Sequence, residues 1–362
     1  MEKLQQYYYD GIPLYHAGLP GFPRNFTRDS IISSIFVNDM EMLKNQLTFC
    51  SLKQGTRNDS FNGEEPGKIF HEYPAVGVKG FSTEFNACDT TALYLIGHNI
   101  YQDITGDKSL AGLQKRNIEN AKNYILNHLN DYFFIEDPKF CGAERFALNV
   151  TYWKDSDING RESGEPAYPI IYPLAHIQNM CGIRCAAKLL NSKNLENIAE
   201  NMSQRLKKLI DPNTGTFYIA KDKKGIIPGI SSDMLHSLFY LNKKDISKEQ
   251  INKIIKYSKE LETPIGYRTL SPKIRFKTKS EYHVKTIWPF EQAIIHMGAR
   301  KFGLRKIKNQ SSKIMDVLDT DPEIFIINGK EIKKGGCDPQ LWTIAAKKYF
   351  KNPDFKIPLF EL

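Results

Sequence analysis

Apolar residues return at every third or fourth position in separate stretches of the chain. One such stretch lies between residues 118 and 129, and another between residues 195 and 209. This spacing places the apolar side chains on one helix face, so both stretches predict amphipathic helices with one buried side. Residues 169–190 are apolar almost throughout, which is typical of a helix buried on all sides. The two kinds of predicted helix alternate along the sequence.

Segments rich in glycine, proline and polar residues separate the predicted helices. Residues 1–26 contain several glycines and prolines without periodicity, which predicts an irregular segment. Residues 211–231 contain a DPNTG turn followed by short apolar runs, which predicts a small β excursion. Other long loops are expected at residues 51–86, 131–166, 263–283 and 319–339. Helices are expected at residues 31–49, 89–107, 118–129, 169–190, 195–209, 232–241, 248–262, 286–303, 308–319 and 340–350.

About eleven or twelve helices with little strand predict an all-α protein. Long loops recur at every second helix junction, as expected for helical hairpins placed side by side. A closed ring of such hairpins would bring the loops of one rim to a shared pocket, and we predict this toroid. An open helical solenoid is the second interpretation. Because no repeat or linker divides the sequence, residues 1–362 are expected to form a single domain.

The composition, 41% apolar and 25% charged residues, is typical of a soluble globular protein. The N-terminal residues lack the apolar core of a signal peptide. No run of about 18 apolar residues predicts a membrane-spanning helix. The six cysteines are scattered through the chain, which predicts reduced, mostly buried thiols and a cytoplasmic location.

The net charge of +9 leaves a polyanionic partner to be considered. The lysines are spread over what we expect to be outer helix faces, and no tract interleaves basic and aromatic residues as single-strand binders do. We therefore interpret the charge as a solvated surface and expect no nucleic-acid partner. A steep salt dependence of binding to mixed-sequence DNA or RNA would instead favour nucleic-acid binding.

The segment YWKDSD, residues 152–157, combines two aromatic side chains with two carboxyl groups. Burial beside aromatic surfaces raises the pKa of a carboxyl group, so that it can donate a proton near neutral pH. Aromatic side chains also form surfaces on which the weakly apolar face of a sugar ring can stack. The alternative is an ordinary loop with a capping Asp and a buried Trp.

The other long loops and helix starts contain further short motifs. In order, the chain carries FTRDS (26–30), GKIFHE (67–72), DTTALYL (89–95), YWKDSD (152–157), IGYRTLS (265–271), EYH (281–283), TIWPFEQA (286–293), PEIF (322–325) and CDPQLW (337–342). This set resembles the amylo-α-1,6-glucosidase domain of glycogen-debranching enzymes. More broadly, it resembles the clan of inverting (α/α)6-barrel glycosidases that includes trehalases and glucoamylases. The resemblance implies an (α/α)6 toroid and a hydrolase acting on glycosides.

The resemblance also implies the two catalytic groups that inverting hydrolysis needs. One carboxylic acid protonates the leaving oxygen, and a second carboxylate activates the attacking water. Asp155 matches the position of the general acid. Glu323, in the loop before the last helix, is the expected base, and Glu291, after Trp288-Pro289, is its rival. Glu323 could instead be a surface acid in a turn, and Glu291 could serve only the dipole of its helix.

The remaining motif positions are expected to bind substrate. The expected substrate-binding residues are Arg28, Asp29, His71, Glu72, Asp89, Trp153, Lys154, Tyr282, His283, Trp288, Gln340 and Trp342. Structural alternatives stay open: a buried Arg–Asp pair between helices, a structural hydrogen bond at His71 and Glu72, and tryptophans in the core. No metal ion or organic cofactor is expected, because this mechanism uses none.

Together these features predict an exo-acting, inverting glycoside hydrolase that releases terminal α-linked glucose from a small α-glucoside or short oligosaccharide. The family motifs are not copied throughout: two of their prolines are replaced by Phe70 and Ala92, and a His-Asp pair by Phe290-Glu291. The alternative is a catalytically inactive carbohydrate-binding or protein-interaction scaffold on the same fold. The sequence indicates neither the linkage nor the oligomeric state.

Overall fold

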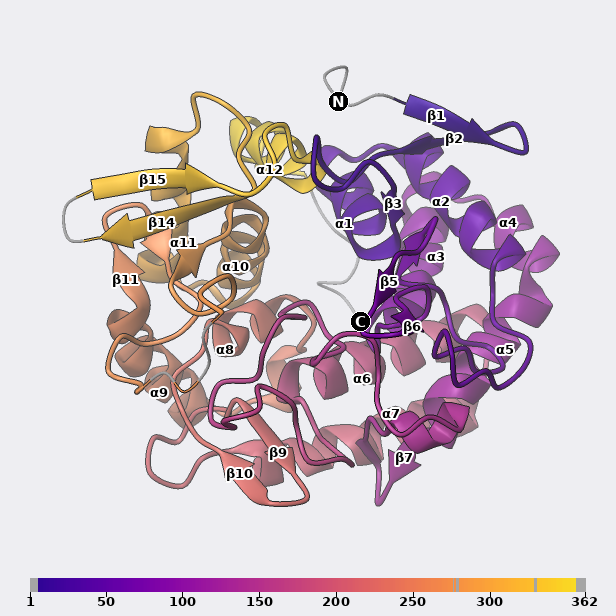
Figure 1. Ribbon diagram of the computed structural model, residues 1–362, viewed down its shortest axis with the longest axis horizontal. Coiled ribbons are helices and arrows are strands. Elements are labelled where there is room, and N and C mark those ends of the chain that lie inside the picture. The colour runs from indigo at the N-terminus through magenta and orange to yellow at the C-terminus, as the bar shows by residue number, and fades with distance from the viewer. Residues whose placement is uncertain (1–5, 276, 278–279, 329–330, 356–362) are drawn as a thin grey trace.

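A computed structural model describes residues 6–275, 277, 280–328 and 331–355. Helices dominate these residues, as predicted, and short antiparallel strands lie between them. Six of the helices pack against one another in a closed cycle, in the order α1, α3, α6, α8, α10, α12 and back to α1. Figure 1 shows the first and last of them, α1 and α12, side by side and the others arranged around a common centre. These inner helices are α1 (Thr27–Val37), α3 (Thr90–Thr105), α6 (Pro173–Leu189), α8 (Asp233–His236), α10 (Pro289–Phe302) and α12 (Leu341–Lys351).

A second set of helices packs on the outside of this cycle. Helix α2 contacts α1 and α3, α5 contacts α3 and α6, α7 contacts α6, α9 contacts α8, and α11 contacts α10. Most of these helices bury one face only, whereas the inner helices are buried nearly throughout, so the two apolar patterns of the sequence correspond to two positions in the fold. The outer helices are α2 (Met40–Leu52), α5 (Lys115–Asn127), α7 (Lys193–Gln204), α9 (Lys248–Ser258) and α11 (Arg305–Ser312), with the short α4 (Ser109–Leu113) before α5.

The strands form small antiparallel sheets in the connections between helices. The predicted β excursion is confirmed as the hairpin β9–β10. The two-stranded pairs are β1 (Gln6–Tyr9) with β2 (Ile12–Tyr15), β3 (Asn25–Phe26) with β4 (Glu72–Tyr73), β5 (Gly77–Val78) with β6 (Phe81–Ser82), β7 (Leu129–Asn130) with β8 (Phe133–Phe134), β9 (Ala220–Asp222) with β10 (Gly225–Ile227) and β11 (Glu262–Thr263) with β12 (Gly266–Tyr267). The three-stranded sheet has the order β13 (Thr286–Ile287), β14 (Ile324–Asn328), β15 (Glu331–Gly335).

Several predicted elements differ from the structure, and three of the differences are large. Residues 31–49 do not form one helix, because Asn38 adopts a left-handed conformation with φ of 52° and the Asp39 side chain caps the new helix α2 at Met42. The irregular N-terminal segment contains the hairpin β1–β2 instead, and the loop at residues 319–339 contains β14 and β15. In the N-terminal segment and in this loop, pairing with another strand stabilises an extended backbone, although the local glycine, proline and charged residues predict irregular structure.

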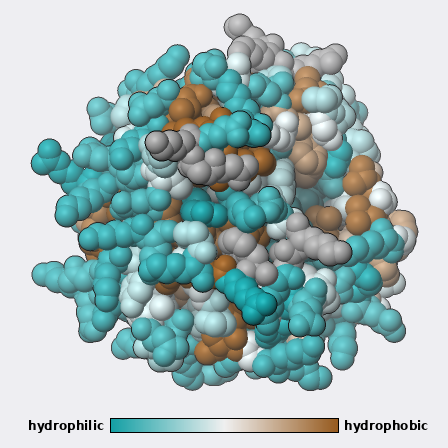
Figure 2. All heavy atoms as spheres, turned by 60° about the vertical axis from the view of Figure 1, so that its left-hand side comes forward, coloured by the Kyte–Doolittle hydropathy of each residue, from teal (hydrophilic) through white to brown (hydrophobic). Residues whose placement is uncertain are grey.

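A large hydrophobic cluster connects the helices, from Leu14 near the N-terminus to Tyr349 in α12. All six cysteines are buried free thiols, as predicted. No helix in the described part of the chain is long and apolar enough to cross a membrane. Figure 2 shows one face of the molecule on which hydrophilic side chains predominate and apolar ones form only small groups.

Candidate active site

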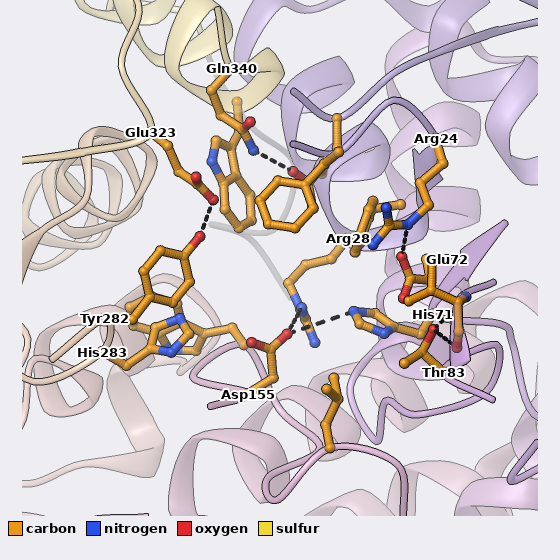
Figure 3. Close-up of a pocket in the computed structure, with 18 of the residues that line it drawn as sticks. Arg24, Arg28, His71, Glu72, Thr83, Asp155, Tyr282, His283, Glu323 and Gln340 are labelled. Carbon is orange, nitrogen blue, oxygen red and sulfur yellow. Dashed lines mark hydrogen bonds and ion pairs between the residues drawn. The ribbon is translucent and has the colours of Figure 1, made fainter. Parts of the chain in front are cut away.

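A cavity of about 210 Å³ lies where several inter-helix segments meet. Its walls come from the starts of α1, α10 and α12, from the segment around β4 to β6, and from residues 148–155. Two carboxyl-bearing side chains from segments far apart in the sequence, Asp155 and Glu323, face each other across it (Figure 3). The other lining residues are Ala17, Phe22, Arg24, Phe26, Arg28, Asp29, His71, Glu72, Val76, Val78, Thr83, Leu148, Trp153, Tyr282, His283, Trp288, Gln340 and Trp342.

Asp155 is held near two side chains without a close hydrogen bond to either. Its Oδ2 lies 3.6 Å from Nη1 of Arg28 and 3.7 Å from Nε2 of His71. The side chain is 24% exposed, and that surface faces the cavity. Removal from bulk water raises the pKa of Asp155 to about 7, with the Arg28 charge opposing and the Asp89 and Glu72 charges adding to the rise. Asp155 can therefore carry a transferable proton near neutral pH.

Glu323 is fixed on both of its carboxylate oxygens. The Tyr282 hydroxyl donates to Oε1, and the backbone N–H of Cys337 donates to Oε2 at 3.0 Å. The residue is only 2% exposed, and burial raises its pKa above the usual value while these two hydrogen bonds lower it. The two donors stabilise the charged form and partly offset the effect of burial.

Two buried polar pairs lie at the cavity wall, Arg28 with Asp89 and Asp29 with Gln340. The guanidinium of Arg28 donates to both oxygens of Asp89, at 3.0 and 2.9 Å, in a bidentate buried pair. Asp29 accepts a hydrogen bond of 3.0 Å from Nε2 of Gln340. Burial raises the pKa of Asp29 well above its usual range, against the opposing charge of Arg28. Asp89 does not line the cavity, so it orients Arg28 from behind.

His71 and Glu72 lie on the wall opposite Glu323 (Figure 3). Burial, with the charge of Arg28 nearby, lowers the pKa of His71 well below its usual range, so its imidazole is neutral. Glu72 accepts a hydrogen bond from Nε of Arg24, and burial raises its pKa against the effect of Thr83 and Arg24. Arg24 was not predicted, although it lies in the FPRNF run directly before the first motif.

The three tryptophans all line the cavity but differ in their contacts. Trp153 Nε1 donates to Asp233 at 3.0 Å, and Trp288 Nε1 donates to Thr286 at 2.9 Å. Trp342 stacks on Phe290 at 3.8 Å, and its buried Nε1 has no hydrogen-bond partner. Trp342 therefore holds the one indole N–H of the three that remains available for a ligand hydroxyl.

Tyr282 and His283 lie on the Glu323 side of the cavity (Figure 3). His283 stacks on Trp288 with ring centroids 4.9 Å apart, and its Nδ1 lies 3.0 Å from the Ser156 hydroxyl. Burial lowers the pKa of His283 well below its usual range. The neutral ring connects the segment of Asp155 with the segment that holds Tyr282.

Lys154 and Glu291 lie outside this cavity, unlike the other predicted site residues apart from Asp89. The Lys154 ammonium contacts Asp233 at 3.1 Å and donates to Ser231 at 2.7 Å, so it fixes the loop rather than reaching the pocket. Glu291 is fully buried and accepts a hydrogen bond of 2.6 Å from Ser232. Its position in the sequence, two residues after Pro289, did not indicate that its carboxylate points to a different cluster.

Several apolar lining residues were also missed by the sequence interpretation. They are Phe22, Phe26, Val76, Val78 and Leu148, which lie in segments expected to be irregular or at their ends, and the composition of these segments does not indicate which side chains face a pocket. The length of the loop expected at residues 51–86 was one sign that part of it would contribute to a site, because long loops in compact domains are often functional. Which of its side chains face the cavity depends on the hairpin β5–β6.

Gly336 has no side chain, and this leaves room for the Glu323 carboxylate beside it. A Cβ atom at this position would lie 2.1 Å from Glu323 Oε2, and the backbone has φ of +72°. We expect Gly336→Ala to displace the carboxylate and lower kcat by about 100-fold, the cost of a misplacement on the order of 1 Å. Steady-state kinetics measures the effect.

Gly303→Ala is the matched control, because Gly303 has nearly the same φ, +69°, with no atom within 4 Å of the added Cβ. Both variants share the backbone strain of about 1–2 kcal/mol. Only the Gly336 variant touches the carboxylate. An equal loss of kcat in both variants would show that the space at Gly336 is not what positions the Glu323 carboxylate.

The sequence matches no known family model and no curated protein sequence. Solved structures with a similar fold do exist. One is the mannosylglycerate hydrolase of Thermus thermophilus, described as GH63, in complex with Tris and D-glycerate: TM-score 0.71, 9% identity, covering 95% of this chain and 97% of that one. The same enzyme with glucose gives a TM-score of 0.70 at 9% identity, covering 94% and 96%. The GH78 rhamnosidase of Bacillus sp. GL1 gives a TM-score of 0.62 at 12% identity, and the match covers 91% of this chain and 32% of the rhamnosidase chain. At these identities the similarity shows a shared fold.

Proposed function

We propose that the chain is an inverting, exo-acting glycoside hydrolase. The observation that carries this proposal is the pair Asp155 and Glu323, which face a single cavity: Asp155 is partly exposed to the cavity and protonatable near neutral pH, and Glu323 is buried and held by two donors. Glycoside hydrolysis by either stereochemical course uses such a pair, and the inverting course is proposed from the resemblance of the motifs to inverting glycosidases. The fold shared with two glycosidases, a mannosylglycerate hydrolase and a rhamnosidase, supports the same class.

In the proposed reaction, Asp155 donates its proton to the glycosidic oxygen while the bond from that oxygen to the anomeric carbon breaks. A water molecule attacks the same carbon from the opposite face, and Glu323 accepts its proton. The products are the free sugar, with inverted configuration, and the alcohol of the leaving group. Arg28 and His71 position the acid, while Tyr282 and Cys337 hold the base.

The finer parts of the proposal extend the motif resemblance. The helix cycle is an (α/α)6 toroid, and residues 1–362 form one domain. The substrate is a small α-glucoside or short oligosaccharide from which terminal glucose is released, as in amylo-α-1,6-glucosidases or trehalases. The predicted substrate-binding residues that line the cavity contact this sugar. The protein acts in the cytoplasm without a metal ion or cofactor.

The test is the purified protein with maltose, isomaltose and trehalose, with the released sugar followed by NMR. Inversion releases the glucose whose anomeric bond is cleaved as the β-anomer, before mutarotation. The leaving glucose of trehalose keeps its α configuration, so trehalose should give β- and α-glucose in equal amounts. Release of α-glucose alone from trehalose would contradict the inverting mechanism. Tight oligosaccharide binding without any product at high protein concentration would instead select a binding scaffold.

The pH dependence of kcat/KM should be bell-shaped. Asp155 must be protonated, so the rate falls above its pKa of about 7, whereas Glu323 must be ionised, so the rate falls at acidic pH through its raised pKa. Measuring the profile with a dinitrophenyl glycoside, whose leaving group departs without a proton, should remove the alkaline limb only. An alkaline limb that persists with this substrate would mean that Asp155 is not the acid.

A further inference from the structure

We propose that the leaving-group end of the cavity accepts an apolar aglycone, an alkyl chain rather than a second sugar. This inference rests on the proposed hydrolase function and specifies its substrate class. It is carried by the distribution of apolar and unpaired polar groups around the cavity.

The two ends of the cavity are defined by the two carboxyl groups. A general acid lies beside the leaving oxygen, and the reacting sugar ring lies between acid and base. Figure 3 shows Glu323 and Gln340 on one side, Arg24 and Glu72 on the other, and Asp155 between them. The sugar therefore occupies the Glu323 side, and the leaving group extends past Asp155 toward Arg24 and Glu72.

The leaving-group end is walled by hydrocarbon side chains. They are Phe22 before β3, Phe26 in β3, Val76 before β5, Val78 in β5, and Leu148 in the loop that carries Asp155. The two phenylalanine rings pack edge to face at 5.6 Å. Val76 is 37% exposed, so the wall continues to the cavity mouth. Such a surface gains free energy by covering an alkyl chain and offers no hydrogen bond to a hydroxyl.

Several polar side chains at this end bind one another or the backbone; His71 does not, because its two ring nitrogens have no hydrogen-bond partner and its Nε2 lies beside Asp155, 3.7 Å from Oδ2. Arg24 donates to Glu72 and lies over the rings of Phe22 and Phe26, at 5.5 and 5.2 Å from their centroids. The Thr83 hydroxyl is engaged by the backbone of Val76, at 3.1 Å from its N and 3.2 Å from its O. A second sugar extending beyond His71 along the hydrocarbon wall would lose water from its hydroxyls and meet side chains that offer no hydrogen bond, at a cost per unpaired group.

The opposite end has buried polar atoms without partners. Gln340 Oε1 and Trp342 Nε1 are both buried, lack a hydrogen-bond partner and belong to residues that line the cavity. The Trp342 donor suits a hydroxyl group of a sugar ring, whereas Gln340 Oε1 lies against Gly18, where an added Cβ would be 1.8 Å away. Polar recognition is thus concentrated around the sugar, and apolar contact around its substituent.

The apolar wall is also held in place. The hairpin β5–β6 turns at Lys79 and Gly80, both with positive φ. Lys79 Nζ reaches Asn149 Oδ1 at 2.5 Å and Glu165 Oε1 at 3.4 Å, which ties the hairpin to the loop that carries Asp155. Val76 and Val78 therefore face the cavity as a preformed surface, which limits the ordering cost of binding.

The test compares methyl, butyl and octyl α-D-glucosides, whose leaving alcohols are chemically alike, with maltose and isomaltose. All are used below the concentration at which octyl glucoside forms micelles. We expect kcat/KM to rise with chain length, by up to about fourfold per methylene while the chain covers the wall. The octyl glucoside should exceed both disaccharides. Hydrolysis of disaccharides with no dependence on chain length would overturn the inference and leave the proposed hydrolase intact.

Val78→Thr tests the wall directly, because threonine keeps the shape and the β-branch but adds a hydroxyl. It should reduce the ratio of kcat/KM for octyl over methyl glucoside. Ile226→Thr is the control, on a 44% exposed β10 side chain outside the cavity, and should leave the ratio unchanged.

Calorimetry with Asp155→Asn separates binding from turnover. Affinity that rises with chain length while wild-type protein cleaves nothing would support the apolar subsite and contradict the hydrolase. Affinity without such a rise would contradict the subsite.

Discussion

Asp155→Asn should lower kcat on an unactivated α-glucoside by about 10²–10⁴-fold, the usual contribution of a general acid. An amide has nearly the shape of the carboxylic acid but cannot transfer a proton to the leaving oxygen. The loss should largely vanish with a dinitrophenyl glycoside, whose leaving group needs no proton. Initial rates with both substrates measure the effect.

Protein stability provides the control for this variant. The folded-state pKa of Asp155 is raised to about 7, so its stabilising contribution is complete below the ordinary pKa of 3.8 and is lost as pH rises through 7. Above pH 7 the wild-type protein must hold a charged carboxylate in the cavity, whereas asparagine stays neutral. The variant should therefore unfold at the same or a higher Tm than wild type at pH 8.

Near-normal activity of the folded Asp155→Asn protein on maltose or isomaltose would refute the acid assignment. A loss of the same size on activated and unactivated substrates would also count against it, because it would place Asp155 in the attack of water rather than in departure of the leaving group.

Glu323→Gln should abolish turnover on activated and unactivated substrates alike. The expected loss in kcat is again about 10²–10⁴-fold, because no other group in this position removes the proton from water. Added azide should restore activity with a dinitrophenyl α-glucoside, since this anion attacks the anomeric carbon without a base and yields the β-glycosyl azide. Product analysis by NMR identifies it.

Glu291→Gln is the matched control for the base. Glu291 is the rival predicted from the sequence, but it lies outside the cavity and accepts a hydrogen bond from Ser232. Glutamine can keep that hydrogen bond through its carbonyl oxygen, so kcat should remain within a few-fold of wild type. If the Glu291 variant alone lost activity and responded to azide, the two assignments would have to be exchanged.

Much of the helical architecture was visible in local patterns. The alternation of all-apolar and one-faced stretches predicted which helices are buried throughout, such as α6, and which bury one side, such as α7. The capping box at Ser247 and Gln250 is present at the start of α9. Helix signals can be read in this way because the contacts that define a helix are local in sequence.

The strands show the opposite behaviour. β14 and β15 lie in a segment that was predicted to be a loop, and β14 pairs with β13, which precedes it by a whole helical hairpin. Strand formation depends on a partner that the local sequence does not specify. The break at Asn38 was missed for a related reason, since a single left-handed residue leaves the apolar pattern of residues 31–49 undisturbed.

The sequence by itself determined the two kinds of helix and the motif residues that carry carboxyl, imidazole and indole groups, because these depend on side-chain identity and local spacing. The tertiary structure alone decided which of them meet. It places Asp155 and Glu323 on one cavity, turns Lys154 and Glu291 into a separate buried cluster, and lines the leaving-group end with valine and phenylalanine. These outcomes depend on how distant segments pack around the closed helix cycle, and no spacing along the chain encodes the direction in which a buried side chain points.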